Sequence, residues 1–370
     1  MPLQRDPADR PAPFVAEEEL WRQRIGSLTV APQLIRELGA DPQVALAAAG
    51  LPESAFDLPE NTIPFAAYGR FMHVAAQITD CEHLGLRFGM VWQLKSLGLL
   101  GELMRNAPTV RDAQRLGFVY HHLNNQGGMI VAREHGSVAE FGYAVYRPGI
   151  VGVRQICDAA LATGVNYMRE LCGPAWVPTE VLLAHSPPAD PSPFRQLFRC
   201  PVRFNAELNT LRFPSHWLDQ PVKGSDPQLL RQLQAQADAR VPPDLVERLR
   251  RALRFMLLNR VVSGDAVAEM LAMHRRTLNR RLHALGTTFR EVLDDVRYDA
   301  AFQLLDSTEL PVEDIADVLG YASVSPFTRA FRRRTGMPPG HWRRQNQRPA
   351  TDAATAPAAA AEISRPAPAA

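Results

Sequence analysis

The sequence predicts a multi-domain protein, in which an N-terminal α+β domain is followed by an all-α domain with two helix-turn-helix motifs joined by a long helix. Three observations predict this fold class. Hydrophobic residues recur at helical spacing up to about residue 123 and then alternate as in strands. From residue 244 onward the pattern is helical throughout. That last part is also basic: residues 243–344 hold 17 arginines and no lysine against 13 acidic residues, whereas the whole chain of 370 residues carries a net charge of only +2.

The domain boundaries follow from changes in composition. Residues 1–19 are rich in proline and charge, and residues 346–370 are rich in alanine and proline, so both ends are predicted to be disordered. Residues 20–222 form the N-terminal domain. Residues 223–243 are predicted to be a linker that contains a short polar helix between prolines. Residues 244–345 form the C-terminal domain.

Residues 20 to about 100 are predicted to be mainly helical. Gly50-Leu51-Pro52 ends one helix and Ile63-Pro64 starts the next, which spans residues 65–79. Tyr68, Phe71 and Met72 lie on one stripe of that helix, which is more typical of a core than of a ligand site. Thr109 is expected to cap a further helix that runs to about Leu123.

The pattern then changes to strands. Residues 128–134 and 138–146 are short β-rich runs separated by His135-Gly136-Ser137, which indicates a hairpin. A long helix is predicted for residues 151–171, ended by Gly173-Pro174, and further strands for residues 180–185, 201–205 and 209–213. The first domain is therefore expected to be a helical lead-in followed by an antiparallel α+β unit.

The first helix-turn-helix motif is predicted at residues 265–283. Val267, Met270 and Leu271 form the inner stripe of a short helix, and Ala272 supplies the small residue at the turn. In the second helix, from about His274 to His283, Leu278 and Leu282 face the core because they are four residues apart. The outer face then consists of Arg275, Arg276, Asn279 and Arg280.

The pattern recurs at residues 312–334, where a short helix ends at Gly320 and a second one spans residues 323–334. Phe327 and Phe331 point inward, and Pro326 is tolerated because it lies in the first turn. The residues predicted to point outward are Val324, Ser325, Thr328, Arg329 and Arg332. Between the motifs, residues 288–306 are predicted to form one helix of about 28 Å.

These two outer faces predict binding to double-stranded DNA. Arginine pairs bidentately with guanine and asparagine with adenine in the major groove. Two such helices, held apart by a rigid helix, can enter successive major grooves, which lie about 34 Å apart. A charged helical face by itself can also be merely solvated, so the interpretation depends on the agreement of both motifs with the connecting helix and the excess of arginine.

The C-terminal residues resemble the DNA-binding domain of AraC/XylS-type bacterial transcription regulators. The resemblance rests on Ile315-Ala316, Leu319-Gly320-Tyr321, Phe327, Arg329-Ala330-Phe331-Arg332 and Thr335-Gly336-Met337-Pro338-Pro339. Two positions depart from the family pattern. Ala322 stands where serine is usual, so Ser323 is a candidate cap for the second helix, and Pro326 is also unusual there.

Residues 38–222 resemble the N-terminal domain of one branch of that family, which includes regulators of ornithine use. The matching positions are Gly50-Leu51-Pro52, Ile63-Pro64, 84–89, 97–101, Pro108-Thr109 and 198–204. The resemblance implies a domain that binds an effector or mediates dimerisation. Arg147 and Arg154 are candidates to hold a carboxylate effector, although arginines beside a hairpin are more often structural. The expected partners are operator DNA, a small-molecule effector, a second copy in a homodimer, and RNA polymerase.

Other classes of function are disfavoured by the residues. None of the four cysteines, Cys81, Cys157, Cys172 and Cys200, belongs to a CxxC pair or lies in the sequence context of an acceptor cysteine. Neither zinc binding nor a DNA-repair methyltransferase fused to the DNA-binding domain is therefore indicated. His121-His122 are adjacent and so project apart, which disfavours a metal site. No catalytic residue, metal or cofactor is predicted. The alternative that remains is a constitutive regulator whose first domain only dimerises. With no secretory or membrane-spanning segment in the sequence, we expect a cytoplasmic protein.

Overall fold

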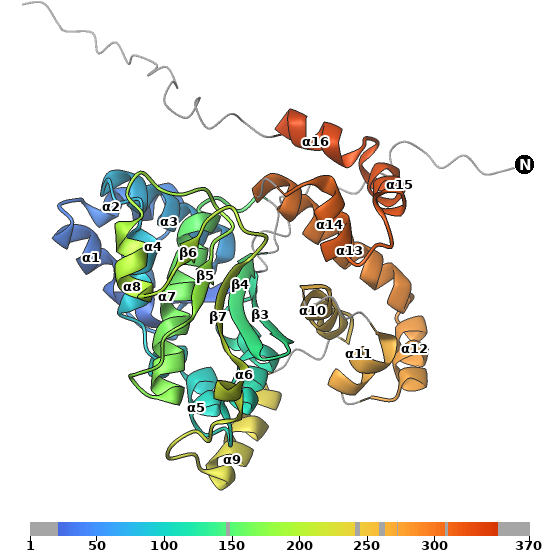
Figure 1. The fold of residues 1–370 in the computed structure, drawn as a ribbon, viewed down its shortest axis with the longest axis horizontal. Helices are drawn as coiled ribbons and strands as arrows, with labels where there is room; N and C mark the ends of the chain where they lie inside the picture. The colour runs from blue at the N-terminus through green and yellow to red at the C-terminus, as the bar shows by residue number, and fades with distance from the viewer. Residues whose placement is uncertain are drawn as a thin grey trace, which may run out of the picture.

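The computed structural model describes residues 21–145, 149–240, 245–258, 263–271, 273–307 and 310–346 (Figure 1). In these ranges an α+β body is followed by an all-helical part, drawn in yellow-brown to red, which confirms the predicted fold class. The predicted terminal tails lie outside the described residues, except for Asn346, which ends the last helix.

The first part of the body is helical, as predicted, with two short strands that the pattern did not reveal. Thr109 caps its helix as expected, because its hydroxyl accepts a hydrogen bond from the Asp112 N–H at 3.1 Å. That helix ends at Val119, earlier than predicted, and a short turn follows. The elements are β1 (Arg22–Arg24), η2 (Gly26–Val30), α1 (Ala31–Glu37), α2 (Pro42–Ala49), η3 (Glu53–Phe56), β2 (Thr62–Pro64), α3 (Phe65–Ile78), α4 (Leu84–Met90), η4 (Leu94–Leu97), α5 (Leu99–Arg105), α6 (Val110–Val119) and η5 (His121–Leu123).

The sheet follows, and it corrects one expectation. The predicted hairpin is confirmed, with Gly128 opposite Val145 and His135 opposite Val138. The strand order is β3-β4-β7-β5-β6. The sheet is not wholly antiparallel, because β6 runs parallel to β5, and the helix α8 makes the crossover that a parallel pair needs. The elements are β3 (Gly128–His135), β4 (Val138–Val145), β5 (Glu180–Leu182), α8 (Ser192–Phe198), β6 (Val202–Arg203), β7 (Asn209–Pro214) and η6 (Ser215–Asp219).

The long helix α7 (Val153–Cys172) joins the helical part to the sheet, since it contacts α3 and α4 as well as β4 and β7. Two glycines of α4 allow the closest of these contacts. A Cβ atom on Gly85 would lie 2.2 Å from the Gln155 carbonyl oxygen, and one on Gly89 would lie 2.4 Å from that of Ala159. These two positions therefore require glycine for α4 to lie directly on the backbone of α7.

The segment 223–243, predicted to be a linker, is mostly packed against the body. It contains α9 (Pro227–Asp238), which lies beside α5 in Figure 1. Leu230, Leu233 and Ala237 are part of the same core cluster as the sheet. Asp226 caps the helix through the N–H groups of residues 228 and 229. Residues 241–244, which connect it to the next helix, lie outside the described part of the chain.

The C-terminal part is all-helical, and its helices closely match the predicted ones. The long connecting helix has 19 residues, as expected, and begins one residue later. Ala272, the predicted turn residue of the first motif, lies outside the described residues. The elements are α10 (Leu245–Leu258), α11 (Gly264–Met270), α12 (Arg275–Ala284), α13 (Phe289–Ser307), α14 (Val312–Val318), α15 (Val324–Thr335) and α16 (Pro339–Asn346).

Candidate nucleic-acid interface

The C-terminal part has two hydrophobic cores, and α13 contributes to both. The first core joins α10, α11 and α12 to the start of α13, through residues such as Leu278, Leu282 and Val296. The second joins α14, α15 and α16 to the end of α13, through residues such as Leu305 and Phe331. Each helix-turn-helix motif is therefore a packing unit of its own on a shared helix.

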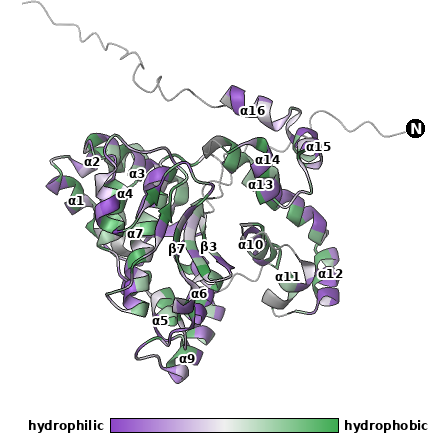
Figure 2. Ribbon diagram, viewed as in Figure 1, coloured by the Kyte–Doolittle hydropathy of each residue, from purple (hydrophilic) through white to green (hydrophobic). Residues whose placement is uncertain are grey.

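The helix α12 buries one stripe and exposes the other, as predicted. Leu278 and Leu282 are both 0% exposed. The four predicted DNA-binding residues, Arg275, Arg276, Asn279 and Arg280, are all exposed. Figure 2 shows this helix with hydrophilic purple and hydrophobic green segments alternating along it.

One of these four residues already has a partner. The Arg275 guanidinium donates a hydrogen bond to the Asp265 carboxylate on α11 at 2.9 Å. No such side-chain partner is described for Arg276, Asn279 or Arg280. Because these three lie three and four residues apart, they share one face of the helix.

The helix α15 repeats this arrangement, with one difference from the prediction. Phe327 and Phe331 are each 2% exposed, and Ser325, Arg329 and Arg332 are exposed. Val324 was expected to point outward, but it packs against the second core. The reason is its spacing, since Val324 lies three residues before Phe327 on the same stripe.

Two further residues of α15, Thr328 and Arg333, differ from the prediction in their exposure or position. Thr328 is half-buried rather than fully exposed. Arg333, which the sequence analysis did not select, is exposed four residues after Arg329 and so lies on the same face. Helical spacing alone was enough to find it.

The ends of α15 differ in how they are capped. Ser323 is the N-cap residue, but its side chain makes no capping hydrogen bond, so the expected serine cap is not formed. Pro326 lies in the first turn, as predicted. At the other end, Gly336 adopts a left-handed conformation, with φ at 80°, and its N–H bonds to the Arg332 carbonyl oxygen at 2.8 Å.

An arginine of the connecting helix also binds the end of the preceding helix, α14. Arg297 of α13 donates to the carbonyl oxygens of Leu319 and Gly320 at 2.9 and 3.0 Å. These are carbonyls at the end of α14, which have no partner within the helix. The guanidinium also lies over the Tyr321 ring, 4.8 Å from its centre. Arg297 therefore fixes the turn that leads into α15.

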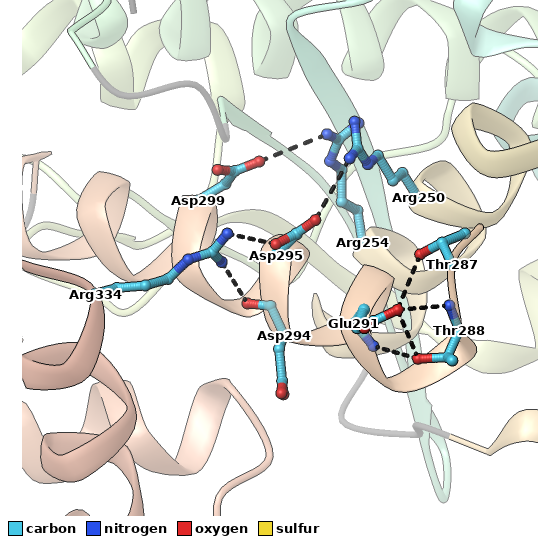
Figure 3. A network of polar contacts seen from close by, with 9 residues as sticks. All are labelled: Arg250, Arg254, Thr287, Thr288, Glu291, Asp294, Asp295, Asp299 and Arg334. Carbon is cyan, nitrogen blue, oxygen red and sulfur yellow. Dashed lines mark hydrogen bonds and ion pairs between the residues drawn. The ribbon is translucent and has the colours of Figure 1, made fainter. Parts of the chain in front are cut away.

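Acidic residues of α13 link the two motifs (Figure 3). Asp295 accepts from Arg334 of α15 through one carboxylate oxygen and lies 3.5 Å from Arg250 of α10 through the other. One turn further on, Asp299 lies 3.8 Å from Arg254, whose side chain is only 3% exposed. The two arginines, 250 and 254, are four residues apart, and so are the two aspartates, 295 and 299. This matching spacing could have indicated the network from the sequence.

This network separates the arginines of α15 into two groups. Arg334 is held by Asp295, and its guanidinium lies 4.4 Å from the centre of the Tyr298 ring. Burial raises the pKa of Tyr298, so its hydroxyl stays neutral beside this arginine. Arg329 and Arg332 are exposed and have no such contact described.

The start of α13 is fixed separately, since Thr288 and Glu291 form a reciprocal capping box (Figure 3).

The two arginines proposed for a carboxylate effector lie elsewhere. Arg147 falls outside the described residues. Arg154 is on α7, with its guanidinium 4.0 Å from the Asp158 carboxylate, which also lies 3.0 Å from His185. Arg154 is therefore beside a buried acid of its own helix.

The cysteines are all free, and two are buried. Burial raises the pKa of Cys172 to about 12 and that of Cys200 to about 11. Since the thiolate is the nucleophilic form, these thiols are poor nucleophiles at neutral pH. Within the described ranges, no helix has the length and apolar character that a membrane span requires.

Comparisons with known proteins match both parts of the chain. The family described as "Arabinose-binding domain of AraC transcription regulator, N-term" matches residues 39–222, and "Helix-turn-helix domain" matches residues 267–345. The chain is 28% identical over 315 residues to the HTH-type transcriptional regulator VirS of Mycobacterium tuberculosis, covering 84% of this chain and 93% of that protein.

It is likewise 28% identical over 322 residues to the Ornithine utilization regulator of Pseudomonas aeruginosa, covering 84% of this chain and 93% of that one. Among solved structures, the transcriptional regulator CdpR from Pseudomonas aeruginosa is 24% identical, with a TM-score of 0.41, covering 82% of this chain and 96% of that one. The two family matches, together with relatives aligned along both domains, show that the chain belongs to the AraC family of DNA-binding transcription regulators.

Proposed function

We propose that α12 and α15 each enter the major groove of one operator and read its sequence. The observation that carries this proposal is the pair of exposed arginine-rich faces at the two ends of α13. The 19 residues of that helix span about 28 Å, close to the roughly 34 Å between successive major grooves. Arg276, Asn279 and Arg280 are assigned to the bases of one half-site, and Arg329 and Arg332 to the other.

The role of the N-terminal body in this proposal is to bind a small-molecule effector and to pair with a second copy. The chain then acts in the cytoplasm as an activator that contacts RNA polymerase. Two observations support control of the C-terminal part, helices α10 to α16 (the reader), by the N-terminal body. The strand β3 contacts α10 of the reader directly, and the Arg254 guanidinium lies 5.6 Å from the centre of the Trp21 ring. A shift in the body can therefore reach α10.

Binding of the full chain to operator DNA is expected to depend steeply on salt. If the two helices together neutralise about 6–10 phosphates, log K against log salt concentration has a slope of about −5 to −9. Fluorescence anisotropy of a labelled operator, between 50 and 300 mM salt, measures this slope. A slope shallower than about −2 contradicts the proposal that both motifs contact DNA.

Single alanine substitutions are expected to relax base preference in separate halves of the operator. Asn279→Ala or Arg280→Ala acts on one half-site and Arg329→Ala or Arg332→Ala on the other, each at a cost of about 1–3 kcal/mol for the preferred base. Selection from a randomised operator library measures the change.

Arg281→Ala is the matched control for this experiment. Arg281 is an exposed arginine of the same helix, but it lies about 100° around the axis from Arg280. Its loss is expected to leave base preference intact. If the test variants instead weaken binding to all sequences equally, their residues contact only phosphates and the assignment to bases is wrong.

A further inference from the structure

A cavity of about 70 Å³ lies inside the N-terminal body, at the boundary between its two main hydrophobic cores. Tyr68 of α3 and Trp92, just after α4, belong to the core of the helical part. Leu100 of α5 and Phe141 of β4 belong to the core around the sheet. Thr163 of α7, the helix that spans both cores, completes the wall. The cavity therefore lies where the two halves of the body are held together.

Three polar groups in this wall have no hydrogen-bond partner in the described structure. They are the indole Nε1 of Trp92, the hydroxyl of Thr163 and the hydroxyl of Tyr167. The three residues are 9%, 4% and 7% exposed. Buried polar groups nearly always have partners, and leaving one unpaired is costly. Three such groups around one cavity indicate that a bound molecule supplies the missing partner.

Two amide side chains in the wall, those of Asn125 and Gln23, are already engaged. Asn125 accepts hydrogen bonds from the N–H groups of Gly127 and Gly128 at 2.9 and 2.7 Å, and its amide donates to the Gln23 side chain. Gln23 in turn donates to the Arg24 carbonyl oxygen at 2.6 Å. These two amides are therefore not free to meet a ligand, whereas the hydroxyls of Thr163 and Tyr167 and the indole of Trp92 are.

The wall also favours a neutral ligand. None of its described residues is an aspartate, glutamate, lysine or arginine. Burial raises the pKa of Tyr167 and of Tyr68, so both phenols stay neutral at physiological pH. A charged ligand would lose its hydration here and find no carboxylate, ammonium or guanidinium group as a counterion. Arg154, the arginine proposed for a carboxylate, is not part of this wall.

We propose that this cavity binds a small neutral molecule, with an apolar body and one hydroxyl or carbonyl group that bonds to Tyr167 and Thr163. This proposal rests on the proposed function, because it makes the cavity the effector site of the regulator. The volume is about half that of an engineered 150 Å³ cavity that binds benzene. A single ring is therefore the upper size, and it requires movement of Met104, a flexible side chain in the wall.

The strand β3 offers a route from this cavity to the reader. Ile130 lines the cavity. Ala132, on the same face of β3 two residues later, lines a groove of about 430 Å³ together with Met256 of α10 and Ala266 of α11. A ligand that moves β3 therefore also changes the surface against which α10 lies.

The test is calorimetric titration of the full chain with three ring compounds of similar size: phenol, toluene and benzoate. Phenol is expected to bind at one site per chain. Toluene lacks the hydroxyl and is expected to bind about five- to tenfold more weakly. Benzoate is charged at neutral pH and is expected not to bind. Absence of phenol binding, or benzoate binding as tight as that of phenol, overturns the assignment.

Two isosteric variants locate the site. In Tyr167→Phe and Thr163→Val, phenol is expected to bind about as weakly as toluene does to the unchanged chain, while the melting temperature without ligand stays the same or rises, because an unpartnered hydroxyl has been removed. Tyr120→Phe is the matched control. It removes a hydroxyl that bonds to Asp238 at 2.7 Å, so it lowers the melting temperature and leaves phenol binding unchanged. Phenol binding that both site variants retain in full overturns the proposal.

Operator titrations with and without phenol separate this proposal from the proposed function. If phenol does not bind but operator binding keeps its steep salt dependence, the cavity assignment fails and the DNA-reading proposal stands. If phenol binds as predicted and operator affinity is unchanged, the cavity is a binding site and its role as effector site is wrong. A coupled site changes operator affinity by about five- to 150-fold.

Discussion

Phe331→Ala is expected to unfold the second helix-turn-helix motif while the first stays folded. The Phe331 ring lies 5.2 Å from that of Phe302 and 5.9 Å from that of Phe327, at the centre of the second core. Removing a buried phenylalanine costs about 3–5 kcal/mol, which is comparable to the whole stability of a small domain. The first core contains none of these residues, so the substitution removes no contact from it and the first motif is expected to stay folded.

Hydrogen exchange along the full chain measures this result. Amides of α14 and α15 are expected to lose protection, whereas those of α10 and α12 keep it. The salt slope of operator binding is expected to fall by about half, because one of the two helices proposed to contact DNA is lost. Leu282→Ala is the reciprocal experiment on the first core. Loss of protection in both motifs with either variant would show that the two cores fold as one unit.

Gly89→Ala is expected to destabilise the N-terminal body, although alanine favours helices. Its Cβ atom would lie 2.4 Å from the Ala159 carbonyl oxygen and 2.5 Å from the Ala162 Cβ atom, so α4 must move away from α7. Forcing extra atoms into a packed core typically costs about 1–3 kcal/mol. Trp92 follows α4 and Thr163 lies on α7, so the same movement also opens the cavity between them.

Gly117→Ala provides the comparison. It is also a buried helical glycine, but its nearest neighbour would be the flexible Met104 side chain at 3.2 Å. There the gain in helix propensity, up to about 1 kcal/mol, is expected to balance or exceed the strain. Urea denaturation of both variants gives the two free energies. Equal stabilities would mean that the contact between α4 and α7 can relax without cost.

The sequence predicts the elements that local rules determine. The boundaries of α3, α7, α12, α13 and α15 follow from hydrophobic spacing and capping residues within each segment. The parallel pairing of β6 with β5 could not be predicted in this way, because the two strands are only two and three residues long and their pairing depends on distant parts of the chain. The same holds for the packing of α9: the helix itself was expected, but its apolar stripe is short and its partner α5 lies about 130 residues earlier.

For the candidate interface, helical periodicity predicts which residues point away from the core, but not which of them are already engaged. Arg329 and Arg334 look alike in sequence, yet only Arg334 is held by an aspartate of α13. The cavity was also invisible to sequence analysis. Its wall combines residues from 23 to 167, and the unpaired state of Tyr167 is a property of the packed structure alone.

The ion pairs around Asp295 add little rigidity to the connection between the two helix-turn-helix motifs. The side chains of Asp295 and Arg334 are 36% and 44% exposed, and pairs exposed to this degree contribute only about 0–1 kcal/mol and weaken as salt rises. The connection between the two motifs is therefore flexible to a small degree: the continuous helix α13 limits its bending, and the Asp295 carboxylate adds only a weak contact. If α12 and α15 bind DNA as proposed, operators whose half-sites differ slightly in spacing can be accommodated at little energetic cost, and the helical pitch of the DNA itself aligns the second helix.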